Sequence, residues 1–304
     1  MDLRQLTALV AVAETGSFSA AARSLHTVQS NVSTHVARLE RELGVALVDR
    51  AGGGLTEEGV AVVSRARHIH AELEALSADV AALRDEVTGT VRLGCIGTSA
   101  RWLVPLVLEE VTRRHPKVHL IVVDATTTSL IPRLLADELD LAVVNLPLAH
   151  PEVVAEHLFD EDRILVAPEG HPLASLERVP FTALAEHDLL LEPSGTAFRD
   201  LLDREAAAAG IELRAKAEVD GLRLIATLAF QGFGAAIVPA TAAPAWLDGR
   251  WRRVPIDGLD PRSVGLARRQ RGLLSAPARA LHAAVVAVVL ADGRSMAGVH
   301  PVTA

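Results

Sequence analysis

The sequence predicts an α-helical N-terminal domain, then one long helix, then a larger α/β region. Three observations lead to this fold class: closely joined short helical segments in the first fifty-odd residues, a heptad pattern after residue 57, and alternating strand-like and helix-like segments from Thr88 onward. The chain has 304 residues, of which 50% are hydrophobic and 22% charged, so it can form two or three domains with buried cores.

The short N-terminal helices are joined too tightly to lie antiparallel. Gly16 is placed to end the first helix in a left-handed cap, and Ser17 or Ser19 can cap a second helix. Thr27 can cap a third helix after a very short turn. Helices joined in this way cross steeply, so the segment predicts a helix-turn-helix.

The third helix has an apolar side and a polar side when its residues are placed at about 100° steps. The apolar stripe contains Val28, Val32, Val36 and Leu39, together with His35, which we expect to be packed or hydrogen-bonded in the core. The polar side carries Gln29, Ser30, Ser33, Thr34, Ala37 and Arg41. Glutamine can bond adenine through two atoms, and hydroxyls can reach bases or phosphates. This helix has no acid before Glu40, so DNA binding is favoured over an ordinary solvated face.

A heptad pattern follows a glycine-rich turn at residues 51–54. Its apolar positions are Ile69, Leu73, Leu76, Val80, Leu83 and Val87, and Val62 with Ala66 extends them backwards. A helix over residues 57–86 would run about 45 Å and present one apolar stripe to a partner helix. The pattern therefore predicts a dimer through this helix, rather than one amphipathic helix lying on its own domain.

Short apolar or β-branched segments alternate with helical ones in the rest of the chain. The strand-like segments are TVRLGCIG, HLIVVDA, DLAVVNL, RILVAP, HDLLLE, ELRAKAEV and GAAIVP, and the helical ones lie near residues 103–114, 130–138, 197–209 and 222–230. This order predicts two α/β units with a ligand crevice at the carboxyl ends of their parallel strands.

The sequence contains no motif of a known catalytic centre. There is no P-loop and no G-x-S-x-G elbow, and His68 and His70 lack acidic or cysteine partners at metal-binding spacing. Gly232 and Gly234 precede a strand, so they indicate a turn instead of a dinucleotide site. Cys95 is expected to be an inert buried thiol, with a nucleophile as the lesser alternative. We therefore expect no catalytic residues, no metal and no cofactor.

Hydroxyl residues stand where predicted strands lead into helices. Thr98 and Ser99, residues 126–129, and residues 194–196 occupy three such junctions. Each is an ordinary cap when taken alone, but three converging on one crevice would bind a small carboxylate or other anion. The candidate charge partners and walls are Arg101, Arg199, Trp102 and Phe198.

The chain resembles the LysR-type transcriptional regulators over essentially its full length. The resemblance rests on the segment from LRQLTALVAVAETGSFSAAARSLH to ELGVALVDR, on LTEEG, and on RLGCIG, LADELDLAVV, LVAPEGHPLA and GFGAAIVP. It implies a winged helix-turn-helix over residues 1–57, a linker helix over 58–87, and an effector domain over 88–304. That domain would have two Rossmann-like subdomains of the type 2 periplasmic-binding-protein architecture, at 88–161 with 266–304 and at 162–265.

The resemblance also implies partners and site residues. The partners would be double-stranded DNA at an interrupted inverted repeat, other copies in a dimer and tetramer, a small effector, and RNA polymerase at the promoter, without a membrane. The DNA contacts would be Gln29, Ser30, Ser33, Thr34 and Arg50. The cleft would be lined by Thr98, Ser99, Thr126, Thr128, Asn145, Gly195, Thr196, Asp220 and Phe233. Two departures are a threonine at position 34, where the family commonly has arginine, and a short glycine wing.

The charge distribution limits how the chain would bind DNA. The net charge of −8 divides into zero over residues 1–56, −4 over 57–86 and −4 over the remainder. A neutral N-terminal domain predicts weak binding to random DNA and dependence on avidity. The resulting expectation is a cytoplasmic regulator that responds to a small anionic metabolite. The alternatives are an enzyme that uses the crevice, with the N-terminal helices serving only oligomerisation, and a DNA-binding architectural protein without an effector.

Overall fold

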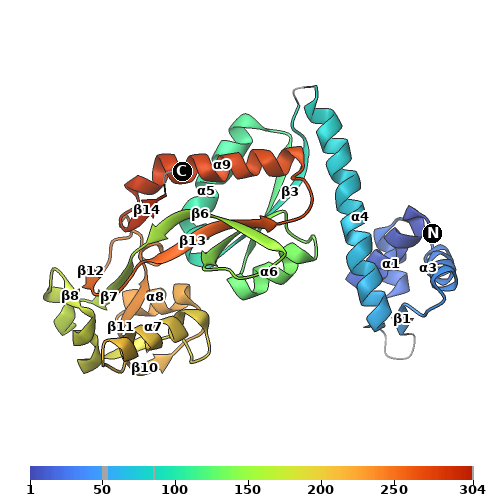
Figure 1. Ribbon diagram of the computed structural model, residues 1–304. Helices are drawn as coiled ribbons and strands as arrows, with labels where there is room; N and C mark the ends of the chain where they lie inside the picture. Colours follow the sequence, from blue (N-terminus) through green and yellow to red (C-terminus); the bar gives the residue numbers. More distant parts are fainter. Residues whose placement is uncertain (50–53, 85, 303–304) are drawn as a thin grey trace. The chain divides into compact units, whose positions relative to one another are not determined.

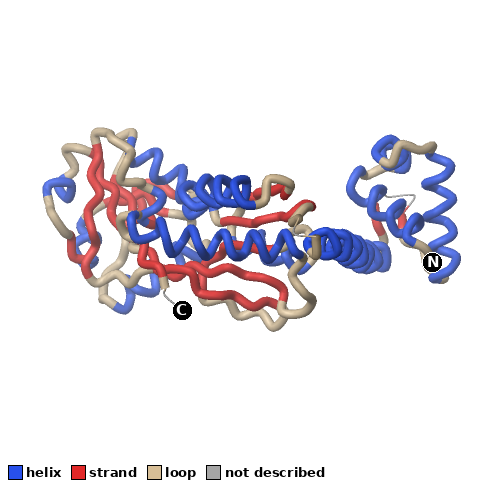
Figure 2. The backbone as a smooth tube through the Cα atoms, turned by 90° about the horizontal axis from the view of Figure 1, so that it is seen from above, coloured by secondary structure: helices blue, strands red, loops and turns tan. Residues whose placement is uncertain are grey.

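The computed structural model describes residues 1–49, 54–84 and 86–302. Contacts between residues divide the chain into two compact units. One unit contains residues 1–86 and the segment 135–138, and the other contains residues 87–134 and 139–304. Helices make up most of the first unit, whereas strands run through the interior of the second (Figure 2). The finer three-part division with boundaries at residues 57 and 87 stays a prediction.

The N-terminal unit begins with three short helices, and side-chain caps set the starts of the first two. These helices are α1 (Leu3–Thr15), α2 (Phe18–Ser24) and α3 (Gln29–Leu43). Asp2 and Gln5 form a reciprocal capping box at the start of α1, and Gly16 ends it with φ of 72°. Ser17, one of the two candidates, caps α2 by accepting a bond from the Ala20 N–H. The joint between α1 and α2 thus follows from caps that are visible in the sequence.

Two expectations about α3 are wrong at its first turn. The residue before the helix is Val28, which has no side-chain cap bond and is exposed, so it lies outside the apolar stripe. Thr27 does not cap α3, because its hydroxyl accepts a bond from Asn31 Nδ2. The rest of the stripe is confirmed, since Val32, Val36 and Leu39 are fully buried against α1 and α2.

A two-stranded ribbon and a long helix complete this unit. The ribbon pairs β1 (Val48–Asp49) with β2 (Gly54–Leu55) in antiparallel register, and α4 (Glu57–Ala82) follows. Thr56 caps α4, and the negative charges of its first two residues, Glu57 and Glu58, suit the positive end of the helix. Gly59 lies so close to Leu47 that a Cβ atom would overlap the Leu47 carbonyl. The helix ends at Ala82, earlier than the predicted Glu86, and residues 83–84 form a turn.

The heptad positions of α4 divide into two groups. Val62 and Ala66, which we expected to extend the seam, pack instead into the core of their own unit. The apolar seam of α4, defined as Ile69, Leu73, Leu76, Val80 and Leu83, is exposed in the single chain. Large apolar side chains exposed at heptad spacing along one stripe are typical of a helix that pairs with another.

The described residues of the second unit form two six-stranded sheets with helices beside them, which agrees with the two α/β units that the sequence predicts. The first sheet has the order β14-β6-β13-β5-β3-β4, in which β3, β4 and β5 are parallel and β13 is antiparallel to β5 and β6. Its strands are β3 (Gly89–Cys95), β4 (Val118–Asp124), β5 (Leu141–Leu146), β6 (Val153–Glu161), β13 (Arg262–Arg269) and β14 (Val299–Pro301). Three helices accompany this sheet (Figure 1): α5 (Gly97–Arg114), α6 (Thr127–Leu135) and α9 (Ala276–Asp292).

The second sheet has the order β10-β9-β11-β7-β12-β8. Its strands are β7 (Arg163–Pro168), β8 (Val179–Pro180), β9 (Asp188–Leu191), β10 (Arg214–Glu218), β11 (Ala235–Pro239) and β12 (Trp251–Asp257). Two longer helices, α7 (Ala197–Ala208) and α8 (Leu222–Phe230), pack with it, and two apolar clusters contain the buried leucines of β7 and β9. Strands β9, β10 and β11 are parallel, so their carboxyl ends share one edge.

The chain crosses between the two sheets twice. It leaves the first sheet at the end of β6 and returns in β13, which begins at Arg262, so the return precedes the predicted boundary at residue 266. Helix α9 is long and apolar enough to cross a membrane by composition, but half of that segment is buried in the unit, and α9 contacts α5, β3 and β6. These contacts identify α9 as a core helix of the first sheet.

Candidate functional sites

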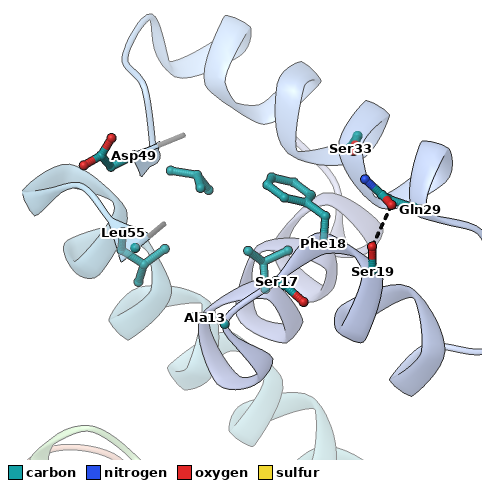
Figure 3. Close-up of a pocket in the computed structure, with 12 residues that line it drawn as sticks. Ala13, Ser17, Phe18, Ser19, Gln29, Ser33, Asp49 and Leu55 are labelled. Carbon is teal, nitrogen blue, oxygen red and sulfur yellow. Dashed lines mark hydrogen bonds between the residues drawn. The ribbon is translucent and has the colours of Figure 1, made fainter. Parts of the chain in front are cut away.

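The first candidate site is the exposed start of α3. Gln29 is the first residue of the helix and is exposed, and the Ser19 hydroxyl donates a 2.7 Å hydrogen bond to its Oε1 atom. Ser19 lies in the first turn of α2, so the bond connects the two helices of the helix-turn-helix (Figure 3). Among the described residues, the amide Nε2 of Gln29 has no hydrogen-bond partner, and Oε1 retains a second lone pair. The side chain is therefore held in place with both polar atoms able to reach a base.

A hollow of about 560 Å³ lies beside this glutamine. It is lined from α1, the start of α2, α3 and the ribbon, and the labelled side chains of Phe18, Ser33 and Leu55 surround it (Figure 3). Gln29 and Ser33, one helical turn apart, both line it. Of the predicted DNA contacts, the structure thus brings these two together with the N-terminus of α2.

The other predicted DNA contacts have different surroundings. Ser30 and Thr34 are exposed on α3 but outside this hollow, and the Thr34 hydroxyl donates to the Ser30 carbonyl at 2.7 Å. Arg50 and most of the predicted glycine wing lie outside the described residues. His35 is half-buried, and its Nδ1 atom is buried without a hydrogen-bond partner among the described residues. It is therefore a packed histidine, as expected, but Nδ1 is not hydrogen-bonded.

The acids of this unit are largely engaged in local structure. The Glu40 carboxylate accepts bonds from the Leu47 and Val48 N–H groups, and Glu42 binds the N-terminal amine and Gln5. Asp2 caps α1, and its pKa is lowered by the hydrogen bond from the Gln5 backbone. Arg4, Arg23, Arg38 and Arg41 are all exposed. The zero net charge therefore does not mean that the surface lacks cations for phosphate contact.

The second candidate site is a cleft of about 630 Å³ in the α/β unit. It lies where the parallel strands β3, β4 and β5 of one sheet and β9 and β10 of the other end. First-turn residues of four helices line it, namely Gly97 of α5, Thr127 of α6, Ala197 of α7 and Leu222 of α8. Free N–H groups and helix dipoles favour negative charge at each of these helix starts. On the second sheet, part of this preference is met by the chain's own Glu192, which accepts from Thr196 and Gly221 just before α7 and α8.

A buried ion pair forms the floor of the cleft at the two crossings between the sheets. Glu161 ends β6 and Arg262 begins β13, and both side chains are almost completely buried. The Arg262 guanidinium donates to Glu161 Oε2 through Nε and Nη2, to Thr98 Oγ1 at 2.6 Å and to Asn145 Oδ1 at 3.2 Å. The Thr241 N–H donates to Glu161 Oε1 at 2.7 Å. One arginine therefore joins cleft side chains to both crossing strands.

A second ion pair joins the two walls. Asp124 ends β4 in the first sheet, and Arg223 lies in the first turn of α8 in the second, with 2.6 Å between Oδ2 and Nη1. The pair passes over Gly97, where a Cβ atom would lie 2.8 Å from Asp124 Oδ1 and 2.9 Å from Arg223 Nε. A glycine at this helix start is therefore required by the close approach of the ion pair.

Two further acids face the cleft from the second sheet. Glu192 directly follows β9 and Asp220 follows β10, and both line the cleft. Burial raises the pKa of Glu192, and the nearby Asp220 charge adds to this rise. Bonds from the Gly221 N–H and the Thr196 hydroxyl oppose the rise in part.

The structure gathers most, but not all, of the predicted effector residues. The lining includes Thr98, Thr126, Thr128, Asn145, Gly195, Thr196, Phe198 and Asp220. Five predicted residues lie outside this lining, namely Ser99, Arg101, Trp102, Arg199 and Phe233. Ser99 and Trp102 point into the core of the unit, where Trp102 packs edge-on against Phe159. Arg101 instead donates to the Ala242 carbonyl and lies over Trp246.

The structure also explains why Phe233 and Arg199, which were expected in the cleft, lie outside its lining. Phe233 is exposed in the turn before β11, and Lys216 binds its carbonyl. Arg199 is buried and bonds Asp203 and Glu218, so it supports α7 rather than the cleft. Four charged residues of the cleft were not predicted from the sequence, namely Arg262, Glu192, Asp124 and Arg223. Glu192 and Asp124 could have been found, because polar residues at the ends of parallel strands face the ligand crevice.

Neither metal nor thiol chemistry finds support in these sites. Among the described residues, no group of three histidine, cysteine or acidic side chains could hold a metal ion. Cys95 ends β3 and is completely buried, with its Sγ atom 3.7 Å from the Ile96 carbonyl. Burial raises the pKa of this thiol far above its usual value, and the Asp124 charge acts in the same direction. The neutral thiol is thus strongly favoured.

Comparison with known proteins gives matches along most of the chain. Residues 3–60 match the bacterial regulatory helix-turn-helix protein, lysR family, and residues 84–289 match the LysR substrate binding domain. The chain is 37% identical, over 93% of each protein, to a probable hydrogen peroxide-inducible genes activator of Streptomyces viridosporus. It is 30% identical to the DNA-binding transcriptional dual regulator OxyR of Escherichia coli K12, over 80% of this chain and 81% of that protein.

Solved structures agree with these relatives. A full-length OxyR cysteine-to-aspartate variant from Pseudomonas aeruginosa gives a TM-score of 0.76 at 25% identity, over 96% of this chain and 95% of that chain. CbnR in complex with its target DNA gives a TM-score of 0.70 at 27% identity, over 95% of this chain and 100% of that chain. The fold of the N-terminal helices and the fold of the two-sheet α/β unit are therefore each the one expected from the sequence.

Proposed function

Because the chain belongs to the LysR family of bacterial transcriptional regulators, we propose that it binds an interrupted inverted repeat near a promoter and responds to a small molecule in its cleft. Its relatives are named as regulators and activators, so the chain is a DNA-binding regulator and not an enzyme. Its partners are DNA, further copies of the chain, the effector and RNA polymerase. Its location is the cytoplasm, without a membrane partner.

The observation that carries the DNA-binding role is the polar start of α3. Gln29 is exposed, is held by Ser19 and lies beside Ser33 at a hollow that also includes the N-terminus of α2. Selection of binding sequences from randomised duplex DNA, followed by footprinting, tests this role. We expect a protected inverted repeat at moderate salt. Failure to enrich any sequence would contradict the proposal.

The exposed seam of α4 supports assembly through this helix, as a dimer and then a tetramer. We expect Leu76→Lys to weaken self-association, because it places a charge in the apolar stripe. Light scattering should show a lower mass and footprinting a lower operator affinity. Ser77→Lys is the matched control, since it introduces the same charge at an exposed position beside the seam. Equal effects of the two variants would count against the seam.

The effector is a small molecule with an anionic group, held at the helix N-termini on the wall formed by β3, β4 and β5. That wall carries the starts of α5 and α6 with the hydroxyls of Thr98, Thr126 and Thr128. Its acid, Asp124, is paired with Arg223. The names of several relatives point to hydrogen peroxide, but the cleft provides the features of a site for a reversibly bound ligand.

Peroxide sensing by a thiol finds little support in this chain. Oxidation needs an accessible thiolate, whereas Cys95 is the only cysteine in the sequence, is fully buried and is held in its neutral form. We expect hydrogen peroxide to leave the operator footprint unchanged, and Cys95→Ser to keep the effector response of the native chain. A peroxide-dependent footprint that disappears in Cys95→Ser would overturn this expectation.

A further inference from the structure

The two walls of the cleft differ in the sign of the ligand charge that they favour. On the wall of the first sheet, the charged side chains are matched, since Asp124 pairs with Arg223 and Arg262 pairs with Glu161. The wall of the second sheet carries Arg223, which is already paired with Asp124. It also carries Glu192 and Asp220, which form no ion pair among the described residues. A ligand whose only charged groups are anionic would interact favourably with the first wall and not with the second.

The first wall suits a carboxylate. The helices α5 and α6 begin there, with hydroxyl side chains in or beside their first turns, and the Thr98 hydroxyl is fixed by Arg262. The Asn145 side chain accepts from Arg262 through Oδ1, and among the described residues its Nδ2 donor has no partner. Helix N-termini, hydroxyls and an amide donor all favour the oxygens of an anionic group.

The second wall suits a cation. Strands β9 and β10 are parallel neighbours, with Leu191 opposite Glu218, so Glu192 and Asp220 leave the same edge of the sheet. Glu192 is half-buried and accepts from Thr196 and from the Gly221 backbone, whereas Asp220 has no side-chain partner among the described residues. Two nearby carboxylates in a cleft are stabilised by a cation between them.

We propose that the effector is a zwitterion of the α-amino acid type, with its carboxylate on the first wall and its ammonium group against Glu192 and Asp220. This inference rests on the proposed effector role of the cleft. A dicarboxylate would place its second charge against these two acids, and a simple carboxylate would leave them unpaired. The cleft volume of about 630 Å³ leaves room for a small side chain of the ligand, and Ile96, Phe198 and Leu222 provide an apolar lining.

The test is a binding screen with matched sets of compounds on the full-length chain. Each of the twenty common L-amino acids, together with ornithine and γ-aminobutyrate, is compared with the acid that lacks its amino group and the amine that lacks its carboxylate. We expect at least one amino acid to raise the melting temperature, with much smaller shifts from its two partial analogues. Calorimetry then gives its dissociation constant.

The acid wall is tested by Glu192→Gln and Asp220→Asn. Loss of a charged hydrogen-bond partner should weaken binding of the amino acid by at least about tenfold for Glu192→Gln. The matched control is Glu212→Gln, which neutralises an exposed acid outside the cleft lining and should leave affinity unchanged. Binding of the amino acid that withstands both Glu192→Gln and Asp220→Asn would overturn the proposed placement of the ammonium group.

The remaining outcomes separate this inference from the proposed function. Equal binding of amino acids and their desamino acids would overturn the zwitterion while retaining an effector cleft. No shift with any compound of the screen would overturn the zwitterion as well. The proposed regulatory function fails on a different measurement, namely the absence of sequence-specific DNA protection, or a bound amino acid that leaves the footprint unchanged.

Discussion

Arg262→Met should lower the free energy of unfolding of the α/β unit by about 3–5 kcal/mol, because it leaves the buried Glu161 carboxylate without its cation. Glu161 is completely buried and Arg262 is 6% exposed, so water cannot replace the lost partner. Urea denaturation of the full chain, followed by a signal of the α/β unit, measures the change. Adding Glu161→Gln should recover part of the loss, because a neutral amide is less costly to bury than a charge.

The control for this prediction is Arg178→Met. Arg178 pairs with Asp257, but the two side chains are 60% and 52% exposed, so solvent screens the pair and the loss should be far smaller than for Arg262→Met. Similar losses for the two variants would contradict the assigned role of Arg262. Since Arg262 also holds Thr98 and Asn145, we expect its variant to lose the effector response even where the unit stays folded.

The predictable parts of the fold are those that depend on neighbouring residues. The Gly16 cap, the Ser17 cap and the buried stripe of α3 follow from local geometry and periodicity. Thr27 failed as a cap because of the turn itself, in which His26 has φ of 51° and the Thr27 N–H bonds the Ala22 carbonyl. The cap of α3 is therefore Val28, and the helix begins one residue later than a Thr27 cap predicts.

The strands likewise fall into those that were predicted from the sequence and those that were not. Buried apolar segments such as β5 and β7 were predicted, because their composition alone favours a sheet interior. Strands β6, β12 and β13 were missed, since they contain several charged residues and acquire their conformation by pairing with distant strands. Strand β13 is central in the first sheet although it begins and ends with arginine.

The same distinction explains the cleft. Hydroxyls at the starts of α5 and α6 can be predicted, because each follows a recognisable strand. The role of Arg262 cannot, because it depends on Glu161, which lies 101 residues away in the chain. Glu192 and Asp220 can be recognised as acids without an ion-pair partner only when the structure shows which arginines are already paired. The sequence therefore indicated the preference for an anionic group but not the preference for a cationic one.

Gln29→Ala should reduce operator affinity by roughly 30-fold or more. One bidentate contact to adenine contributes about 1–3 kcal/mol, and a dimer on an inverted repeat makes two such contacts. Gln29 is exposed at the start of α3, so alanine should leave the fold intact. Asn31→Ala is the matched control, because this exposed amide lies on another face of the helix and donates to Thr27. Equal losses for the two variants would refute base reading by Gln29.

Ser19 provides an internal check on this mechanism. Its hydroxyl holds Gln29 Oε1 at 2.7 Å, so Ser19→Ala should weaken operator binding less than Gln29→Ala, while relaxing the preference for adenine at the same position. If Ser19 acts by positioning Gln29, the double variant should bind no more weakly than Gln29→Ala alone. Additive losses in anisotropy titrations would instead mean that Ser19 contacts DNA directly. The position of Ser19 in the first turn of α2 permits such a contact as well.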